Sequence, residues 1–254
     1  MMMRRLIAGE EIEKIYSHDD ERQKVLDGVS VSIGEGEFVS VMGPSGSGKS
    51  TLLFALSGMD TVDGGQVVFN GRELGELREN ELADLRRKEM GFVFQQPTLM
   101  KNLNILDNII LPSMRDNRRN VKAITERARL LMARTGIAGL EKRGITQVSG
   151  GQLQRAGICR ALMNRPRIIF GDEPTGALNR EAAEEIMDLL AEINDEGTAV
   201  MLVTHDAKVA AKTTRILFMS DGKIVSELTL PQFRGADLEE RMEKVMVRMR
   251  ETGI

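Results

Sequence analysis

The sequence predicts an α/β fold built on a mixed, mainly parallel sheet with an inserted helical subdomain. Three observations lead to this class. Short apolar runs of strand length alternate with amphipathic helical segments along most of the chain. A glycine-rich loop of the kind that cradles phosphate stands between one apolar strand and one helix. A charged, helix-rich stretch interrupts the alternation near the middle of the chain.

The first third of the chain mixes strands with a helix. Residues 25–33 alternate apolar and polar side chains as a half-buried strand does, and EGEFVSVMG is a continuous apolar strand that runs into glycine. STLLFALSG is typical of a helix that ends at Gly58. GGQVVFNGREL predicts a strand interrupted by the turn pair Asn70–Gly71.

The later elements define the predicted domain organisation. From about residue 80 to 155 charged helical segments dominate, including ERARLLMARTG with a helix stop at Gly136. From residue 167 onward RIIFGDE, EAAEEIMDLLAEIN, AVMLVTH and RILFMSDGKIV alternate strand and helix, with a turn at Asp221–Gly222. We expect one domain with a catalytic core at about 1–94 and 156–231, a helical subdomain at about 95–155 and a helical tail at about 232–254.

Composition narrows the class of protein. The chain has 254 residues, 41% of them hydrophobic, which is enough for one domain with a proper core. A formal net charge of -3 provides no basic footprint, so we expect no nucleic-acid partner. The single cysteine, Cys159, fits a reducing compartment and favours a small buried side chain in a helix. No apolar run approaches the roughly 20 residues of a membrane span. The apolar stretch at the start of the chain is too short for the core of a signal peptide, so we expect a cytoplasmic location.

The segment GPSGSGKST matches the phosphate-loop pattern GxxxxGK[ST] in its expected context, between a buried strand and a helix. Glycines let successive backbone N–H groups converge on phosphate oxygens, and the helix N-terminus adds its positive dipole end. Lys49 supplies an ammonium to the β- and γ-phosphates, and the Ser50 hydroxyl is placed to ligate Mg²⁺. This predicts a P-loop NTPase core whose nucleotide-binding residues are Gly43, Pro44, Ser45, Gly46, Ser47, Gly48, Lys49, Ser50 and Thr51.

Two strand ends carry the predicted catalytic groups. Asp172 and Glu173 follow the apolar strand RIIFG, at the carboxyl end where α/β proteins form ligand sites. We interpret Asp172 as a partner of Mg²⁺ and Glu173 as the base that polarises the attacking water. His205 ends the strand AVMLVT and could reach the γ-phosphate. By themselves, an Asp-Glu pair is more often a solvated loop and a strand-end histidine is more often ordinary; the upstream P-loop favours the functional reading.

The segment VSGGQLQR is a second glycine-rich helix start, about a hundred residues after the P-loop. A helix start of this kind is a good anion site, but the anion need not come from the P-loop of its own chain. The P-loop, VSGGQ and strand-Asp-Glu in this order resemble the ATP-binding-cassette ATPases over nearly the whole chain. The resemblance implies an N-terminal antiparallel β subdomain, ATP and Mg²⁺ as cofactors, and a dimer in which Ser149, Gly150, Gly151 and Gln152 contact ATP held by the second copy.

The resemblance also assigns roles to residues that carry no clear signal alone. Gln95 matches the glutamine that touches Mg²⁺ and the attacking water, with Gln96 the second choice. Tyr16, which we place upstream of the first strand, matches the aromatic ring that stacks on adenine; without the resemblance it reads as a surface-packed ring. His205 matches the switch histidine. Residues 176–179 match the D-loop along the dimer interface.

Three positions depart from the family pattern. Val148 begins the signature where leucine is commoner, and KRGITQ before it lacks a frequent proline, which leaves the contact to a membrane partner open. Asn179 ends the D-loop where aspartate is typical, so hydrogen-bonding capacity is kept and the charge is lost.

The surface and the tail suggest partners. GFVFQQPTLM and FGDEPTGALN resemble the lipoprotein-release, macrolide-export, cell-division and antimicrobial-peptide-resistance subgroup. We expect residues 95–119 to form the cleft for a membrane permease. RDNRRN at 115–120 reads as a solvated helix edge or, less simply, as a contact to lipid headgroups. The tail carries one apolar stripe that packs on its own domain or, alternatively, on a partner: Leu238, Met242, Val245 and Met249.

The function expected from these observations is that of an ATP-hydrolysing subunit which dimerises around two ATP and powers a separate, integral membrane permease. It would sit peripherally on the cytoplasmic face of a bacterial cell membrane. The alternative is a non-transport cassette ATPase that acts on nucleic acid or ribosomes, but such proteins carry long insertions or fused cassettes for which 254 residues leave no room. A small-molecule P-loop kinase would leave VSGGQ unexplained.

Overall fold

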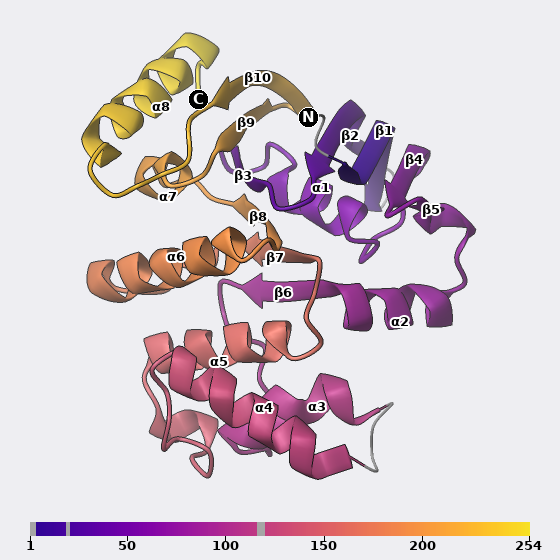
Figure 1. The fold of residues 1–254 in the computed structure, drawn as a ribbon. Helices are drawn as coiled ribbons and strands as arrows, with labels where there is room; N and C mark the ends of the chain where they lie inside the picture. Colours follow the sequence, from indigo (N-terminus) through magenta and orange to yellow (C-terminus); the bar gives the residue numbers. More distant parts are fainter. Residues whose placement is uncertain (1–3, 19–20, 116–119) are drawn as a thin grey trace.

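The computed structural model describes residues 4–18, 21–115 and 120–254, and combines two sheets with a helical lobe (Figure 1). The predicted fold class is confirmed: a mixed, mainly parallel sheet, an antiparallel N-terminal sheet and inserted helices are all present. The strands are β1 Arg5–His18, β2 Glu21–Gly34, β3 Phe38–Met42, β4 Gly64–Phe69, β5 Arg72–Glu73, β6 Met90–Phe94, β7 Ile168–Asp172, β8 Ala199–Val203, β9 Arg215–Ser220 and β10 Lys223–Thr229.

The larger sheet has six strands in the order β10-β9-β3-β8-β7-β6, parallel except for β10. Its central strands are mostly apolar because both faces are covered: Phe170 faces one hydrophobic cluster, and its neighbour Ile169 faces another. Asp172 pairs in register with Val203, so the ends of β7 and β8 lie side by side. This register places the segments after both strands at one edge of the sheet.

The smaller sheet is antiparallel, in the order β2-β1-β4-β5. Its strand β1 corrects one expectation, because Tyr16 lies within this strand and not upstream of the first strand. The sequence concealed β1 because its alternation is broken: the pairing shifts register near Glu11, whose backbone has φ 49°. Charged side chains on the exposed face of this strand further weakened the apolar signal.

Helices pack between the two sheets and on the outer face of the large sheet. Helix α1 lies between the two sheets, where Leu52, Leu53 and Leu56 are fully buried in a shared core. Helices α3 to α6 share a second core with the other face of the large sheet. The helices are α1 Lys49–Leu56, α2 Glu79–Glu89, α3 Ile105–Met114, α4 Val121–Arg134, α5 Gly150–Leu162, α6 Arg180–Asp195, α7 Ala207–Ala211 and α8 Leu238–Thr252, with short 3-10 turns at Leu74–Glu76 and Ile145–Gln147.

The helical lobe of α3, α4 and α5 extends below the large sheet (Figure 1). Helix α5 runs from Gly150 to Leu162, so the predicted subdomain boundary at residue 155 falls inside a helix that packs on β6. The basic segment 115–120 lies largely outside the described residues. Within the described ranges, no helix is long and apolar enough to cross a membrane.

The tail helix α8 packs on its own domain, as the simpler of the two predictions had it. Val245 is fully buried, and Leu238, Met242 and Met249 pack against the same cluster, which includes alanines of α7. Cys159 is likewise a fully buried residue of α5. Burial raises the pKa of the Cys159 thiol to about 11, in spite of the hydroxyl of Thr135 at 3.1 Å, so this residue is a packing element.

Candidate nucleotide site

The P-loop connects β3 to α1, and its glycines are required by close approach and by backbone conformation. A Cβ at Gly43 would lie 2.2 Å from the carbonyl oxygen of Met219. Gly48 has φ 97°, and a Cβ there would lie 2.7 Å from the carbonyl oxygen of Val25. Gly46 has φ 82° with open space beside it. The loop is therefore packed against neighbouring backbone at Gly43 and Gly48, and it is open at Gly46.

Lys49 is almost completely buried at the start of α1, and its ammonium donates to the carbonyl oxygens of Gly43 at 2.8 Å and Pro44 at 2.6 Å. Burial lowers the pKa of Lys49, while the carboxylates of Glu173 and Asp172 act in the opposite direction. The first turn of α1 contains no acidic residue, so its positive end is not neutralised. These features fit a site for a phosphate chain.

Ser50 and Asp172 provide a pair of oxygen ligands for a hard cation. The Ser50 hydroxyl donates to Oδ1 of Asp172 at 2.8 Å, although the two residues are 122 positions apart. Burial raises the pKa of Asp172, the Ser50 hydrogen bond lowers it, and the charge of Glu173 raises it further. A divalent cation would relieve this desolvation, and carboxylate plus hydroxyl oxygens fit Mg²⁺.

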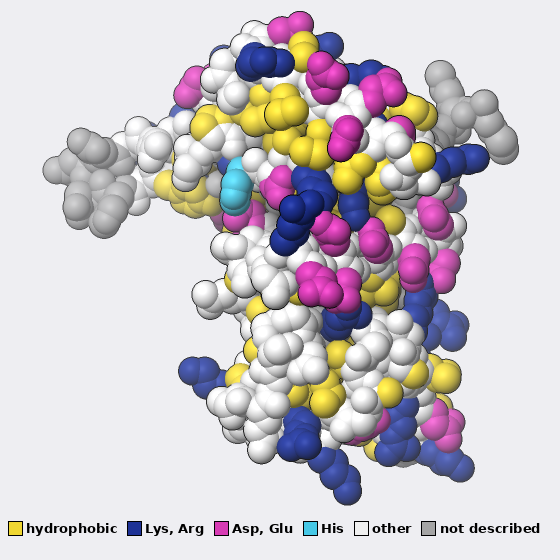
Figure 2. All heavy atoms as spheres, turned by 90° about the vertical axis from the view of Figure 1, so that its left-hand side faces the viewer, with side chains coloured by type: hydrophobic (Ala, Val, Ile, Leu, Met, Phe, Trp, Pro, Cys, Tyr) yellow, Lys and Arg dark blue, Asp and Glu magenta, His cyan; other side chains and the backbone are white. Residues whose placement is uncertain are grey.

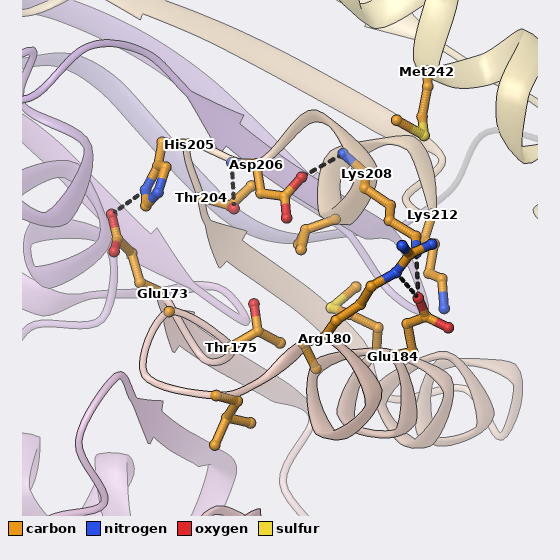
Figure 3. A pocket seen from close by; sticks show the side chains of 15 residues that line it. Glu173, Thr175, Arg180, Glu184, Thr204, His205, Asp206, Lys208, Lys212 and Met242 are labelled. Atoms are coloured by element: carbon orange, nitrogen blue, oxygen red, sulfur yellow. Dashed lines mark hydrogen bonds and ion pairs between the residues drawn. The ribbon is translucent and has the colours of Figure 1, made fainter.

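Glu173 follows β7 with a left-handed backbone, φ 48°, which is uncommon for a residue with a side chain. Its N–H donates to the carbonyl oxygen of Val203 at 3.0 Å, which ties it to the neighbouring strand end. Oε1 of Glu173 lies 3.0 Å from Nδ1 of His205, and Figure 3 shows the two side chains pointing toward each other. The sheet edge thus brings the predicted base and the predicted switch histidine together.

Tyr16 faces the same cavity as the P-loop, about 640 Å³ in volume, which is within the range of small-molecule sites. Its hydroxyl donates to Oδ2 of Asp60 at 2.7 Å, and the Lys14 ammonium lies 5.2 Å from the ring centroid. Tyr16 is 42% exposed, yet these two contacts hold its side chain in place. The cavity lining is Tyr16, Gln23, Val25, Ser45, Gly46, Gly48, Lys49, Ser50, Thr51, Glu173 and His205.

Gln95 is exposed directly after β6 and lies against the loop that follows Glu173. A Cβ at Gly176 would lie 2.9 Å from Nε2 of Gln95 and 3.2 Å from Oε2 of Glu173. The missing side chain at position 176 therefore lets Gln95 and Glu173 approach each other. This places Gln95 near the Glu173 carboxylate.

The segment Ser149–Gln152 begins helix α5 at a different place. The Ser149 hydroxyl accepts from the N–H of Gln152 at 3.3 Å, and the Gln152 side chain accepts from the N–H of Ser149 at 2.9 Å. The helix start lines a separate hollow of about 600 Å³ that shares no lining residue with the P-loop cavity: Gly136, Ser149, Gly150, Gly151, Gln152, Arg155, Ala177, Leu178, Asn179, Ala182 and Glu185. Within one chain, this segment and the P-loop do not form one site.

Asn179, the departure in the D-loop, caps helix α6. Its side-chain oxygen accepts from the N–H of Ala182 at 2.9 Å. Asparagine and aspartate are equally good residues at this position of a helix. The cap is therefore kept, and only the charge is absent.

Sequence reasoning missed two supporting residues. Lys14, whose ammonium contacts both the Tyr16 ring and Asp60, lies on the strand that the broken alternation concealed. Gln154 is 1% exposed and donates to the carbonyl oxygens of Phe94 at 2.9 Å and Pro174 at 2.7 Å. Gln154 thus connects the residue before Gln95 with the residue after Glu173. A polar residue four positions after Gly150, on the inward face of α5, was the available signal.

Comparison with known proteins settles the family. The profile described as "ABC transporter" matches residues 26–176, which is more than half of the chain. The chain belongs to the ABC transporter family. The cassette is 40% identical over 232 residues to the macrolide export ATP-binding/permease protein MacB of Pasteurella multocida (strain Pm70), covering 91% of this chain and 36% of that protein. It is 39% identical over 227 residues to the lipoprotein-releasing system ATP-binding protein LolD of Aquifex aeolicus (strain VF5), covering 89% and 99%.

The predicted resemblance to the lipoprotein-release and macrolide-export subgroup is thereby confirmed. The cassette spans about a third of the length of the MacB relative but nearly all of LolD. Among solved structures, a dimeric post-hydrolysis state of the ATP-binding cassette MJ0796 bound to ADP and Pi is similar, with a TM-score of 0.81 and 37% identity, covering 89% of this chain and all of that one.

Proposed function

We propose that this cassette hydrolyses ATP as the nucleotide-binding subunit of an ABC transporter, that two copies enclose two ATP, and that the dimer powers an integral membrane permease. One observation carries the proposal: the Ser149–Gln152 helix start and the P-loop line separate hollows of the same chain. Each is an anion site that is incomplete alone. A second copy that faces the first would supply the missing half of each site.

The chain's own residues divide the reaction among themselves. Lys49 and the N–H groups of the loop hold the phosphate chain, and the Tyr16 ring supports the base. Ser50 and Asp172, with Gln95, would hold Mg²⁺, which when bound neutralises the charge that develops on the phosphates. Glu173 orients the attacking water and receives its proton, and His205 orients the Glu173 carboxylate through the 3.0 Å contact.

A groove on the helical side supports the permease contact. It has a volume of about 440 Å³ and runs between α2, β6 and α3. Met59 and Leu111, each 45% exposed, line it. Arg160 adds positive charge beside Arg86, which is paired with Glu79. Apolar side chains with basic neighbours suit a short amphipathic helix that carries acidic residues. The groove overlaps the region 95–119 that we expected to receive a permease helix.

The permease sets the place of action. ATP is held inside the cell, so a cassette that drives a membrane protein works at the cytoplasmic face of the membrane, here proposed for a bacterium because LolD of Aquifex aeolicus is similar over nearly its full length. Export or mechanical work on a membrane protein is the direction favoured by the names of the MacB and LolD relatives. On the face drawn in Figure 2, acidic and basic side chains are interspersed, which gives no support to the nucleic-acid alternative.

The test is the Glu173→Gln variant on gel filtration with and without ATP. Glutamine keeps the shape of the side chain but cannot take a proton, so hydrolysis should fall by about 100-fold or more, and ATP should be trapped between two copies. We expect elution as a monomer without nucleotide and as a dimer with ATP and Mg²⁺. Lys49→Met in the same background, which removes the phosphate ligand, should remain a monomer. A Glu173→Gln protein that stays monomeric in saturating ATP would contradict the shared site.

A further inference from the structure

Arg241 of α8 is the largest fully buried side chain in the described part of the protein, with 1% of its surface exposed. Its guanidinium donates to three backbone carbonyl oxygens: Ala211 through Nε at 2.6 Å, Thr213 through Nη2 at 2.7 Å and Pro231 through Nη1 at 2.6 Å. Two of these carbonyls lie at the carboxyl end of helix α7 and just after it. Oδ2 of Asp237 also lies 3.5 Å from Nη1. A buried cation with three carbonyl partners and one carboxylate is costly to place and costly to disrupt.

Helix α7 begins two residues after His205, with Asp206 between them. It has five residues, Ala207–Ala211, and a helix of this length is not stable without tertiary contacts. Asp206 caps its start by accepting from the N–H of Lys208 at 2.7 Å. At its other end the backbone N–H groups of Lys212 and Thr213 donate to the carbonyls of Val209 and Ala210. The carbonyl of Ala211, the last residue of the helix, accepts from Arg241.

The two helices fit because the facing side of α7 is small. Ala207, Ala210 and Ala211 pack in the same cluster as Met242 and Val245 of α8. Alanines allow the backbones to approach closely, which brings the Arg241 side chain within reach of the α7 carbonyls. Lys208 and Lys212 then pair with Glu184 and Asp188 of α6, as Figure 3 shows for the Lys208 end. Helix α7 is therefore held between the tail helix and the helix that follows the D-loop.

We propose that Arg241 is a positioning residue for His205. By holding the carboxyl end of α7, it fixes the orientation of the helix that begins two residues after His205, and so keeps Nδ1 of His205 at Glu173. The catalytic consequence rests on the proposed function, whereas the placement of the imidazole does not. The tail then acts on hydrolysis through α7, without touching nucleotide.

The experiment compares Arg241→Met with Arg248→Met. Arg248 lies on the same helix, but it donates to Oγ of Ser226 at 2.9 Å and to the carbonyl oxygen of Glu227, on β10 and away from α7. The chain has two histidines, so the imidazole proton signals of His205 can be identified by their loss in His205→Ala. In nucleotide-free protein we expect Arg241→Met to shift the His205 signals and Arg248→Met to leave them in place.

Kinetics provide the second measurement. Arg241→Met should lower kcat by about tenfold with KM unchanged, because a group that acts in the transition state is displaced while ATP binding is untouched. Arg241→Lys, which keeps the charge and one donor direction, should recover part of kcat, and it replaces the methionine variant if that protein does not fold. The inference would be overturned if the His205 signals did not move in Arg241→Met, or if Arg241→Met and Arg248→Met lost kcat equally. If Arg241→Met shifts the His205 signals but the wild-type protein hydrolyses no ATP, the positioning role stands and the proposed function is contradicted instead.

Discussion

Nδ1 of His205 and Oε1 of Glu173 lie 3.0 Å apart, and the two residues come from adjacent parallel strands 32 positions apart in the chain. The contact depends on the pairing of Asp172 with Val203, which sets the two strand ends level. Glu173 has a left-handed backbone, and its N–H donates to the carbonyl oxygen of Val203 at 3.0 Å, so its backbone is tied to the end of the neighbouring strand. The histidine is the partner found there.

From this contact we expect His205→Ala to hydrolyse ATP at least about 100-fold more slowly than the wild type, because the Glu173 carboxylate loses the group that orients it. ATP affinity should change little, since Lys49 and the loop glycines are untouched. His205→Gln keeps a hydrogen-bonding side chain and should retain more activity than alanine. Steady-state phosphate release and nucleotide titration measure the two quantities, and an alanine variant as active as the wild type would exclude this role.

Ser149→Asp separates helix capping from anion binding. Aspartate caps a helix as well as serine does, so α5 and the fold should be preserved. Its negative charge would repel the phosphate of ATP on the second copy, so hydrolysis should fall by about 100-fold or more while the monomer still binds ATP.

The matched control for this position is Ser149→Asn, which caps the helix without adding charge and should keep most of the activity. Circular dichroism, nucleotide binding and phosphate release should be measured on both. Equal activity of the aspartate and asparagine variants would mean that no phosphate approaches this helix start.

Lys49→Met and Lys14→Met should differ in their effect on stability: only the second should lower it. Burial lowers the pKa of Lys49, so its charge is costly without nucleotide, and the methionine variant should melt at the same temperature as the wild type or higher. Burial also disfavours the charge of Lys14, but the hydrogen bond and charge of Asp60 outweigh it and raise the pKa, so its replacement should lower the Tm. Thermal melts with and without ATP test both; ATP should no longer raise the Tm of Lys49→Met.

Because the Cys159 thiol is buried, we expect the protein to lose stability at high pH. Its pKa is raised from 9.0 in the unfolded chain to about 11 in the fold, so the neutral thiol is favoured by folding. This contribution is complete below pH 9 and is lost as the pH rises toward about 11. Urea unfolding midpoints at several values in this window should fall more steeply for the wild type than for Cys159→Ala. Parallel curves would show that the thiol does not titrate in this way.

Much of the fold was predictable because its signals are local. The P-loop pattern, the apolar strands before Asp172 and His205, and the turn glycines each depend on a few adjacent residues. Strand β1 was not predictable in this way, because a bulge at Glu11 and exposed charged side chains erase its alternation. Tyr16 was therefore found through resemblance, while its support by Asp60 appeared only in the fold.

The sequence by itself determined the fold class and the family, and it predicted the residues proposed to carry the chemistry, since each of these rests on short motifs whose backbone preferences are local. Only the tertiary structure decided that Glu173 meets His205, that Ser149 lies apart from the P-loop of its own chain, and that Arg241 reaches the carbonyls of α7. These relationships join segments tens of residues apart. They depend on strand register, helix packing and burial, which arise only when the whole core assembles.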